Sequence, residues 1–156
     1  MRFILSACVA LAVSSSGAAA KDCPDFTIEA RYDLSYSEDD LWSERTHSIA
    51  AGGSVELWNC SRFDGSGYVA RQPDFNMFLT RNNKDRMIRF KVSGDEGCDT
   101  VLLINTPSGS WLFNDDDDGI DPVIRVRSAE TGRYDIWAGT FGPDICMSTL
   151  HIEAFP

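Results

Sequence analysis

The chain has 156 residues, with 24 acidic residues against 14 lysines and arginines, and its formal net charge at pH 7 is −10. This length is enough for one domain with one hydrophobic core. The negative charge argues against binding to nucleic acid or to an anionic membrane surface, since both attract basic proteins.

Residues 1–20 are expected to be a signal peptide and not part of the fold. An apolar run from Phe3 to Val13 is followed by small residues that end in Ala18-Ala19-Ala20, the pattern before a cleavage site. A lipoprotein signal ending at Cys8 is the alternative, but it would leave an apolar region of about three residues, against the roughly 7–15 of export signals. We therefore expect residues 21–156 to be secreted or periplasmic, with no membrane attachment.

Alternation of apolar and polar residues dominates the rest of the chain. From Phe26 to Leu34, every even position is apolar and every odd position is polar. A strand with one buried face has this pattern, because successive side chains point to opposite faces. Residues 37–45 are expected to form one helical turn or a loop. Alternation, or a short apolar run, predicts further strands at 54–58, 74–80, 88–92, 100–104, 110–113, 124–126, 134–137 and 150–154.

Turn residues separate these segments at short intervals, as at Gly52-Gly53, Asn82-Asn83 and Thr131-Gly132. Many short strands with such turns favour an all-β fold, here a single antiparallel β-sandwich of jelly-roll type. No segment has a sustained period of 3.6 residues, and no linker indicates a second domain. We therefore expect residues 21–156 to form one β-sandwich domain.

Four cysteines follow the expected cleavage site: Cys23, Cys60, Cys98 and Cys146. An even number in an exported chain predicts disulfides, for which three pairings exist. Cys23 precedes the first predicted strand and Cys60 ends the second clear one, whereas Cys98 and Cys146 each begin a strand in the second half. We therefore favour the pairs Cys23–Cys60 and Cys98–Cys146.

The most unusual segment runs from Asn114 to Asp121 and includes four consecutive aspartates. Adjacent carboxylates repel one another, and calcium, which takes about six to eight oxygen ligands from flexible loops, would remove the repulsion. We expect calcium to bind through members of the set Asp99, Asn114, Asp115, Asp116, Asp117, Asp118 and Asp121. Because neighbours on an extended segment face opposite ways, the ligands would be Asp115 with Asp117, or Asp116 with Asp118, completed by Asp99 or Asp121. The alternative is a solvated acidic hairpin.

Three stretches resemble a known family. Residues 99–111, the acidic run and residues 132–140 (Gly-Arg-Tyr-Asp-Ile-Trp-Ala-Gly-Thr) are similar to the bacterial pre-peptidase C-terminal domain. Upstream, Gly67-Tyr68-Val69 and Pro73-Asp74-Phe75 resemble small exported proteins that carry this domain alone. The resemblance implies a jelly-roll β-sandwich on an exported protein, often beside secreted proteases, with calcium or a matrix polymer as ligand in some relatives. The acidic run is longer here than the family's two adjacent aspartates.

Motifs for hydrolytic catalysis are weak in this sequence. His47 and His151 are the only histidines, and Glu96 stands where the Gly-Asp-Ser-Gly of serine proteases has its nucleophile. No Gly-x-Ser-x-Gly occurs. We therefore expect an exported, non-catalytic binding or accessory domain rather than an enzyme. The alternative in the enzyme class is a secreted protease-associated protein or peptidase.

Two further features suggest partners, which would be an extracellular polymer or a secreted protein. Trp111 adjoins the acidic loop, and an exposed tryptophan there could stack on sugar rings; core packing is the commoner role of aromatic residues. Arg89, Lys91, Arg125 and Arg127 occupy outward positions on two predicted strands. If those strands pair, they form a basic stripe that either receives an anionic partner or is neutralised by neighbouring acids.

Overall fold

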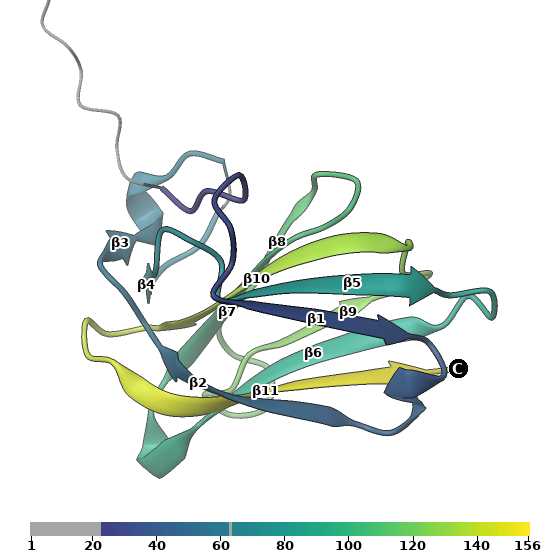
Figure 1. Cartoon of the computed structure of the whole chain (residues 1–156). Coiled ribbons are helices and arrows are strands. Elements are labelled where there is room, and N and C mark those ends of the chain that lie inside the picture. Colours follow the sequence, from purple (N-terminus) through teal and green to yellow (C-terminus); the bar gives the residue numbers. More distant parts are fainter. Residues whose placement is uncertain (1–22, 63) are drawn as a thin grey trace, which may run out of the picture.

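The computed structural model describes residues 23–62 and 64–156, so the expected signal peptide lies outside the described residues. Besides three short 3-10 helices, η1 (Asp40–Trp42), η2 (Leu57–Asn59) and η3 (Asp95–Gly97), these residues form strands (Figure 1). No helix within them is long and apolar enough to cross a membrane. The strands are β1 (Tyr32–Ser37), β2 (Arg45–Ala51), β3 (Val55–Glu56), β4 (Tyr68–Val69), β5 (Phe75–Arg81), β6 (Met87–Gly94), β7 (Thr100–Asn105), β8 (Trp111–Asn114), β9 (Val123–Val126), β10 (Gly132–Thr140) and β11 (Cys146–Phe155).

Two sheets pack face to face, which confirms the predicted β-sandwich (Figure 1). The seven-stranded sheet has the order β1-β5-β10-β4-β3, and β7 and then β8 continue it from the other edge of β10. The four-stranded sheet has the order β2-β11-β6-β9. Every strand pair in the described residues is antiparallel except β1 with β5. These two run parallel because the chain crosses to the other sheet as β2 before it returns.

Apolar side chains from both sheets fill the space between them. Met77 on β5, Ile136 on β10, Phe90 on β6 and Ile152 on β11 are all fully buried members of this core. On each strand the core residues lie two positions apart, as Leu150, Ile152 and Ala154 do on β11, because successive side chains point to opposite faces. Burial of each such side chain stabilises the fold by roughly 1.5–3 kcal/mol.

A second apolar cluster lies on the outer face of the seven-stranded sheet. Leu103 on β7 and Trp137 on β10 point away from the main core and are covered by Val55, Leu57 and Val69 from the segment that holds β3 and β4. Because both faces are covered, the middle of each of these two strands is buried at successive positions. This explains why short apolar runs predicted strands at 100–104 and 134–137, and both strands are confirmed.

Both predicted disulfides are confirmed. Cys23–Cys60, with Cα atoms 5.8 Å apart, ties the start of the described chain to the second apolar cluster. Cys98–Cys146, with Cα atoms 6.4 Å apart, ties the segment before β7 to the first residue of β11. Cys98 lies in the connection that crosses from β6 of one sheet to β7 of the other, so the second bridge fastens this crossover to β11.

The first predicted strand is wrong over residues 26–31. β1 begins only at Tyr32, and the preceding residues form turns over the outer cluster, where the ring centroids of Phe26 and Trp111 lie 6.1 Å apart. The apolar residues of this segment therefore cover a sheet face without joining the sheet. β2 was not predicted, because only Ile49 and Ala51 of this strand are buried and its residues show little alternation. The helical turn expected within 37–45 is η1.

Candidate functional site

The acidic run connects β8 of one sheet to β9 of the other. Its backbone folds into a tight turn, in which Asp118 N–H donates to Asp121 O at 3.1 Å and Asp121 N–H donates to Asp118 O at 3.3 Å. Gly119, with φ of 71°, supplies the left-handed residue that this turn requires. The loop is thereby held at both ends by strands of different sheets.

Three carboxylates of the loop face the four-stranded sheet and are neutralised there. Asp118 Oδ2 lies 2.7 Å from Lys91 Nζ, and Asp121 Oδ2 lies 3.3 Å from the same ammonium. The hydrogen bond from Lys91 lowers the pKa of Asp118, and the same contact raises the pKa of Lys91. Asp117 Oδ2 pairs with Arg125 Nη1 at 2.9 Å. These cations belong to the predicted basic stripe, so the acidic loop is their counter-charge.

The remaining carboxylates lie toward Asp99, just before β7. Asp99 Oδ1 is shielded from solvent and accepts no hydrogen bond from the described residues. Burial raises the pKa of Asp99, and the nearby negative charges of Asp116 and Asp115 raise it further. Asp99, Asp115 and Asp116 therefore form an acidic corner, in which three carboxylates act on one another.

The structure does not bring the seven expected calcium ligands to one point. Asn114 uses its side-chain oxygen to accept the backbone N–H of Val123 at 2.8 Å, so it fixes the start of β9. Both expected ligand pairs are divided, since one aspartate of each pair is held by Lys91 or Arg125. Within residues 23–62 and 64–156, no group of three or more histidine, cysteine, aspartate or glutamate side chains is arranged to hold a metal ion. Calcium at the acidic corner would require the loop carboxylates to turn toward Asp99.

The aromatic residues divide between packing and exposure. Trp111 is half-buried, with its ring centroid 5.3 Å from that of Trp137, so it closes the outer apolar cluster rather than presenting a free face. Trp42 and Trp58 are each 53% exposed. The guanidinium of Arg86 covers Trp42 at 4.2 Å from the ring centroid, whereas Trp58 packs edge-on against Tyr68. Trp58 therefore replaces Trp111 as the candidate stacking residue.

The two histidines have different surroundings. His47 Nε2 lies 3.0 Å from the hydroxyl of Tyr36, and burial lowers the pKa of this imidazole. His151 lies on the outer face of the four-stranded sheet between Ser93 Oγ, 2.9 Å from Nε2, and Glu44 Oε2, 3.2 Å from Nδ1. Sequence reasoning missed this second arrangement, because its members come from three distant segments that only the pairing of β2, β6 and β11 brings together.

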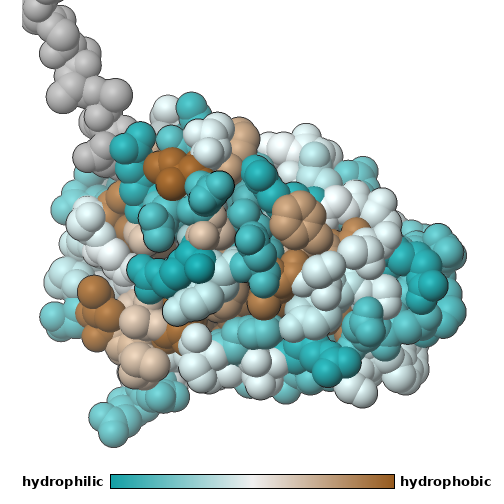
Figure 2. All heavy atoms as spheres, viewed as in Figure 1, coloured by the Kyte–Doolittle hydropathy of each residue, from teal (hydrophilic) through white to brown (hydrophobic). Residues whose placement is uncertain are grey.

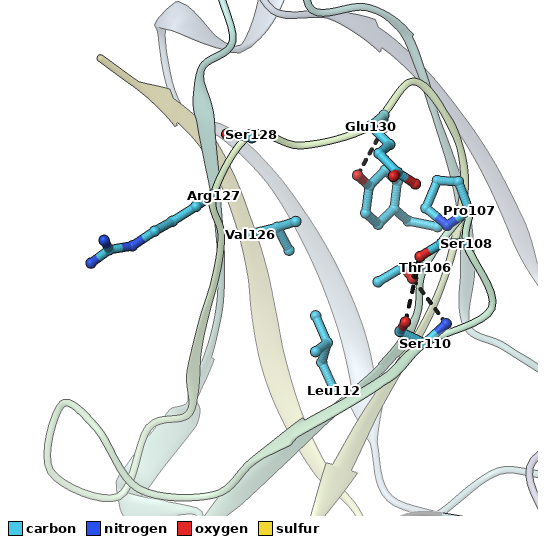
Figure 3. A pocket seen from close by; sticks show the side chains of 10 residues that line it. Thr106, Pro107, Ser108, Ser110, Leu112, Val126, Arg127, Ser128 and Glu130 are labelled. Atoms are coloured by element: carbon cyan, nitrogen blue, oxygen red, sulfur yellow. Dashed lines mark hydrogen bonds between the residues drawn. The ribbon is translucent and has the colours of Figure 1, made fainter.

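A cavity of about 240 Å³ lies at the side of the sandwich where β8 and β9 diverge (Figure 3). Leu112 and Val126 point into it, while Arg127 points away. At its other end Thr106 Oγ1 lies 3.0 Å from Ser108 Oγ and accepts the backbone N–H of Ser110 at 3.1 Å. These hydroxyls form hydrogen bonds within their own turn. The cavity is therefore lined by polar side chains at this end and by Leu112 and Val126 at the other.

The turn between β10 and β11, together with the start of β11, exposes three apolar side chains. Ile145 is 66% exposed, Met147 55% and Phe141 51%. In the space-filling view, hydrophobic atoms gather over this turn at the lower left (Figure 2). Apolar side chains that gather in this way are more typical of contact surfaces than isolated exposed residues are.

Comparison with known proteins finds likeness to solved structures. No family profile matches the sequence, and no curated protein matches it. The structure is similar to the crystal structure of the pre-peptidase C-terminal domain of a collagenase from Bacillus anthracis, with a TM-score of 0.45 and 10% sequence identity, over 78% of this chain and 94% of that chain. Membership of the family suggested by the sequence stays a prediction.

Proposed function

We propose that this chain is an exported binding domain that takes a calcium ion at the acidic corner of Asp99, Asp115 and Asp116. The observation that carries the proposal is the Asp99 carboxylate, which has a shielded oxygen with no donor among the described residues and a pKa raised by burial and by its acidic neighbours. A bound cation would give the shielded oxygen an electrostatic partner and would also offset the repulsion among the three carboxylates. The other three loop carboxylates already have Lys91 and Arg125 as partners.

The chemistry of the corner favours calcium over other divalent ions. All of its side-chain ligands are hard carboxylate oxygens, which suit calcium better than zinc. Magnesium demands nearly ideal octahedral geometry, which a loop of irregular shape satisfies poorly. Calcium also tolerates backbone carbonyl ligands and water, so three carboxylates are enough to begin its shell.

Export is supported by the two disulfides, Cys23–Cys60 and Cys98–Cys146, because such bridges form and persist in oxidising compartments. It is also supported by the leader-like composition of residues 1–20. An accessory role beside secreted proteases rests on the resemblance in sequence alone. The partner would then be an extracellular polymer or a secreted protein.

Thermal melting of the exported chain in calcium, magnesium or chelator tests the calcium site. A ligand that binds only the folded state raises the unfolding free energy by RT ln(1 + [L]/Kd), about 2.7 kcal/mol at a hundredfold excess over Kd. For a domain of this size, we expect calcium to raise Tm by about 5–10 °C. Asp99→Asn should remove the shift.

Asp117→Asn is the matched control, because Asp117 is paired with Arg125 and should not be a ligand. A shift that survives both Asp99→Asn and the double change Asp115→Asn with Asp116→Asn would place the ion elsewhere. If calcium leaves Tm unchanged and calorimetry detects no heat of binding, the loop is a solvated acidic turn.

A polymer-binding module is the second candidate, and the exposed ring of Trp58 favours it. Trp58 and Tyr68 form an edge-on pair on the surface of the outer cluster, with ring centroids 5.3 Å apart. Stacking on a sugar ring or a proline would use the free face of Trp58. Co-sedimentation with insoluble polysaccharides and collagen, repeated with Trp58→Ala, tests this function, and equal binding by both proteins would exclude it.

A further inference from the structure

Three side chains on the outer face of the four-stranded sheet form a hydrogen-bonded chain. Ser93 Oγ lies 2.9 Å from His151 Nε2, and His151 Nδ1 lies 3.2 Å from Glu44 Oε2. The hydroxyl thus contacts one ring nitrogen and the carboxylate contacts the other. In this order an imidazole can accept a proton from a nucleophilic hydroxyl while the carboxylate orients the ring.

Strand register holds the chain of contacts in place. His151 on β11 is directly opposite Lys91 on β6, and Ser93, two residues further along β6, is its diagonal neighbour. On its other side His151 is opposite Thr46 on β2, two residues after Glu44. Arg89 Nη2 lies 3.2 Å from Glu44 Oε1 and so fixes the second oxygen of this carboxylate. Ser93 and His151 are on paired strands, which keep mutual geometry better than loops do, whereas Glu44 precedes β2 and is held by its contact with Arg89.

A cavity of about 380 Å³ opens over these residues and is lined mainly by charged side chains. Lys91 lies on its wall, two positions before Ser93 and on the same face of β6. Contacts with Asp118 and Asp121, at 2.7 and 3.3 Å, fix the ammonium of Lys91. An ammonium has three N–H donors, and these two contacts use two of them. The third can donate to an oxygen that becomes negative during acyl transfer. Charged walls and this volume suit a small polar substrate.

We propose that Ser93, His151 and Glu44 form a hydrolytic site for small polar esters. Ser93 Oγ attacks the ester carbonyl carbon while His151 Nε2 accepts the hydroxyl proton, and Lys91 faces the carbonyl oxygen as it becomes negative. The bond from that carbon to the leaving alkoxide breaks, the alcohol takes the proton from His151, and an acyl group remains on Ser93. Water then attacks the acyl carbon with His151 as base, and the proton returns to Ser93 as the acid leaves.

Hydrolysis of p-nitrophenyl acetate by the purified exported chain tests the proposal, together with labelling by a fluorophosphonate that is mapped by peptide mass. We expect multiple turnovers and a label on Ser93. Ser93→Ala should remove the label and lower kcat at least tenfold. Glu44→Gln should lower kcat at least tenfold with little change in KM, because Glu44 positions the base and does not contact the substrate.

His47→Ala is the matched control, because His47 contacts Tyr36 and lies outside this cavity. It should keep both turnover and label, and thermal melts check that every variant is folded. Equal turnover in Ser93→Ala, a label on another residue, or neither turnover nor label in the parent protein would overturn the proposal. The calcium site is measured separately by melting, so failure of either proposal leaves the other standing.

Discussion

At the scale of single residues, Asp74 occupies the point where β10 changes partners. β10 pairs with β5 as far as Ile136 and with β4 at Thr140, and the N–H of Ala138 lies between the two. Asp74 Oδ2 accepts this N–H at 2.9 Å, although Asp74 is only 2% exposed. Burial raises the pKa of Asp74 to about 6, while the bond from Ala138 and the charge of Arg31 act to lower it.

This shift predicts that Asp74 makes the unfolding free energy depend on pH. The folded pKa, about 6, exceeds the unfolded value of 3.8, so the native state binds the proton more tightly. The stabilisation from the bound proton is complete below the unfolded pKa of 3.8 and is lost as pH rises through the folded pKa of about 6. The loss is about 3 kcal/mol at neutral pH, from about 1.4 kcal/mol per unit of pKa.

Asp74→Asn keeps an oxygen for the Ala138 N–H but carries no charge. Urea unfolding from about pH 4 to pH 7 should therefore give a flatter stability profile for this variant than for the parent protein. Asp33→Asn, at an exposed position on β1, is the control for the loss of one negative charge. Parallel profiles for all three proteins would contradict the assignment of the pH dependence to Asp74.

At the scale of elements, β4 can approach β10 only because Gly139 has no side chain. A Cβ at this position would lie 2.5 Å from the carbonyl oxygen of Tyr68 and 2.6 Å from methyl carbons of Val69 and Val101. Such distances are far below van der Waals contact. The outer apolar cluster, which needs β4 in place, therefore depends on this glycine.

Gly139→Ala should push β4 away from β10 and open the outer cluster. We expect the unfolding free energy to fall by about 1–3 kcal/mol, the usual cost of overpacking. Gly142→Ala is the matched control, because a Cβ there would meet nothing within 4 Å. Urea unfolding of both variants measures the difference, and equal losses would mean that the contact with β4 is not the cause.

Strands with one strongly apolar face were predictable from the sequence, whereas the strands with which they pair were not. β6 and β11 alternate cleanly because one face of each meets the core and the other meets solvent. The same period at residues 26–31 arises from an irregular segment that covers an apolar sheet face, and a local pattern cannot distinguish the two. β2 escaped prediction because it is an edge strand with few buried side chains, and such strands are defined by their neighbour.

The candidate sites illustrate the same limit. Repulsion within the acidic run was visible in the sequence. The division of its carboxylates was not, because Lys91 on β6 comes near the loop only through the pairing of β6 with β9. Ser93, His151 and Glu44 are likewise brought together by sheet register. Their residue types carry no local motif, and only a correct strand order would have placed them side by side.

At the scale of the whole molecule, the two disulfides hold different parts of the sandwich. Cys98–Cys146 fastens the crossover between the two sheets to β11, and the main core between the sheets holds most of the buried aliphatic side chains. Cys23–Cys60 joins the N-terminal segment to the smaller outer cluster. The large main core can hold the two sheets together without a disulfide. The smaller outer cluster is less able to hold residues 23–31, which have no regular structure.

We therefore predict unequal consequences when each bridge is removed. From loop-closure entropy alone, removal of either bridge should lower the unfolding free energy by nearly the same amount, about 4 kcal/mol, because the bridges span 37 and 48 residues. Changing Cys23 and Cys60 to alanine should also release the segment over Trp111, which raises tryptophan exposure and amide exchange in β3, β4 and β7 before global unfolding. Changing Cys98 and Cys146 should instead lower the global unfolding free energy without local opening. Hydrogen exchange read by mass spectrometry distinguishes the two, and identical exchange maps would show that the outer cluster is as cooperative as the main core.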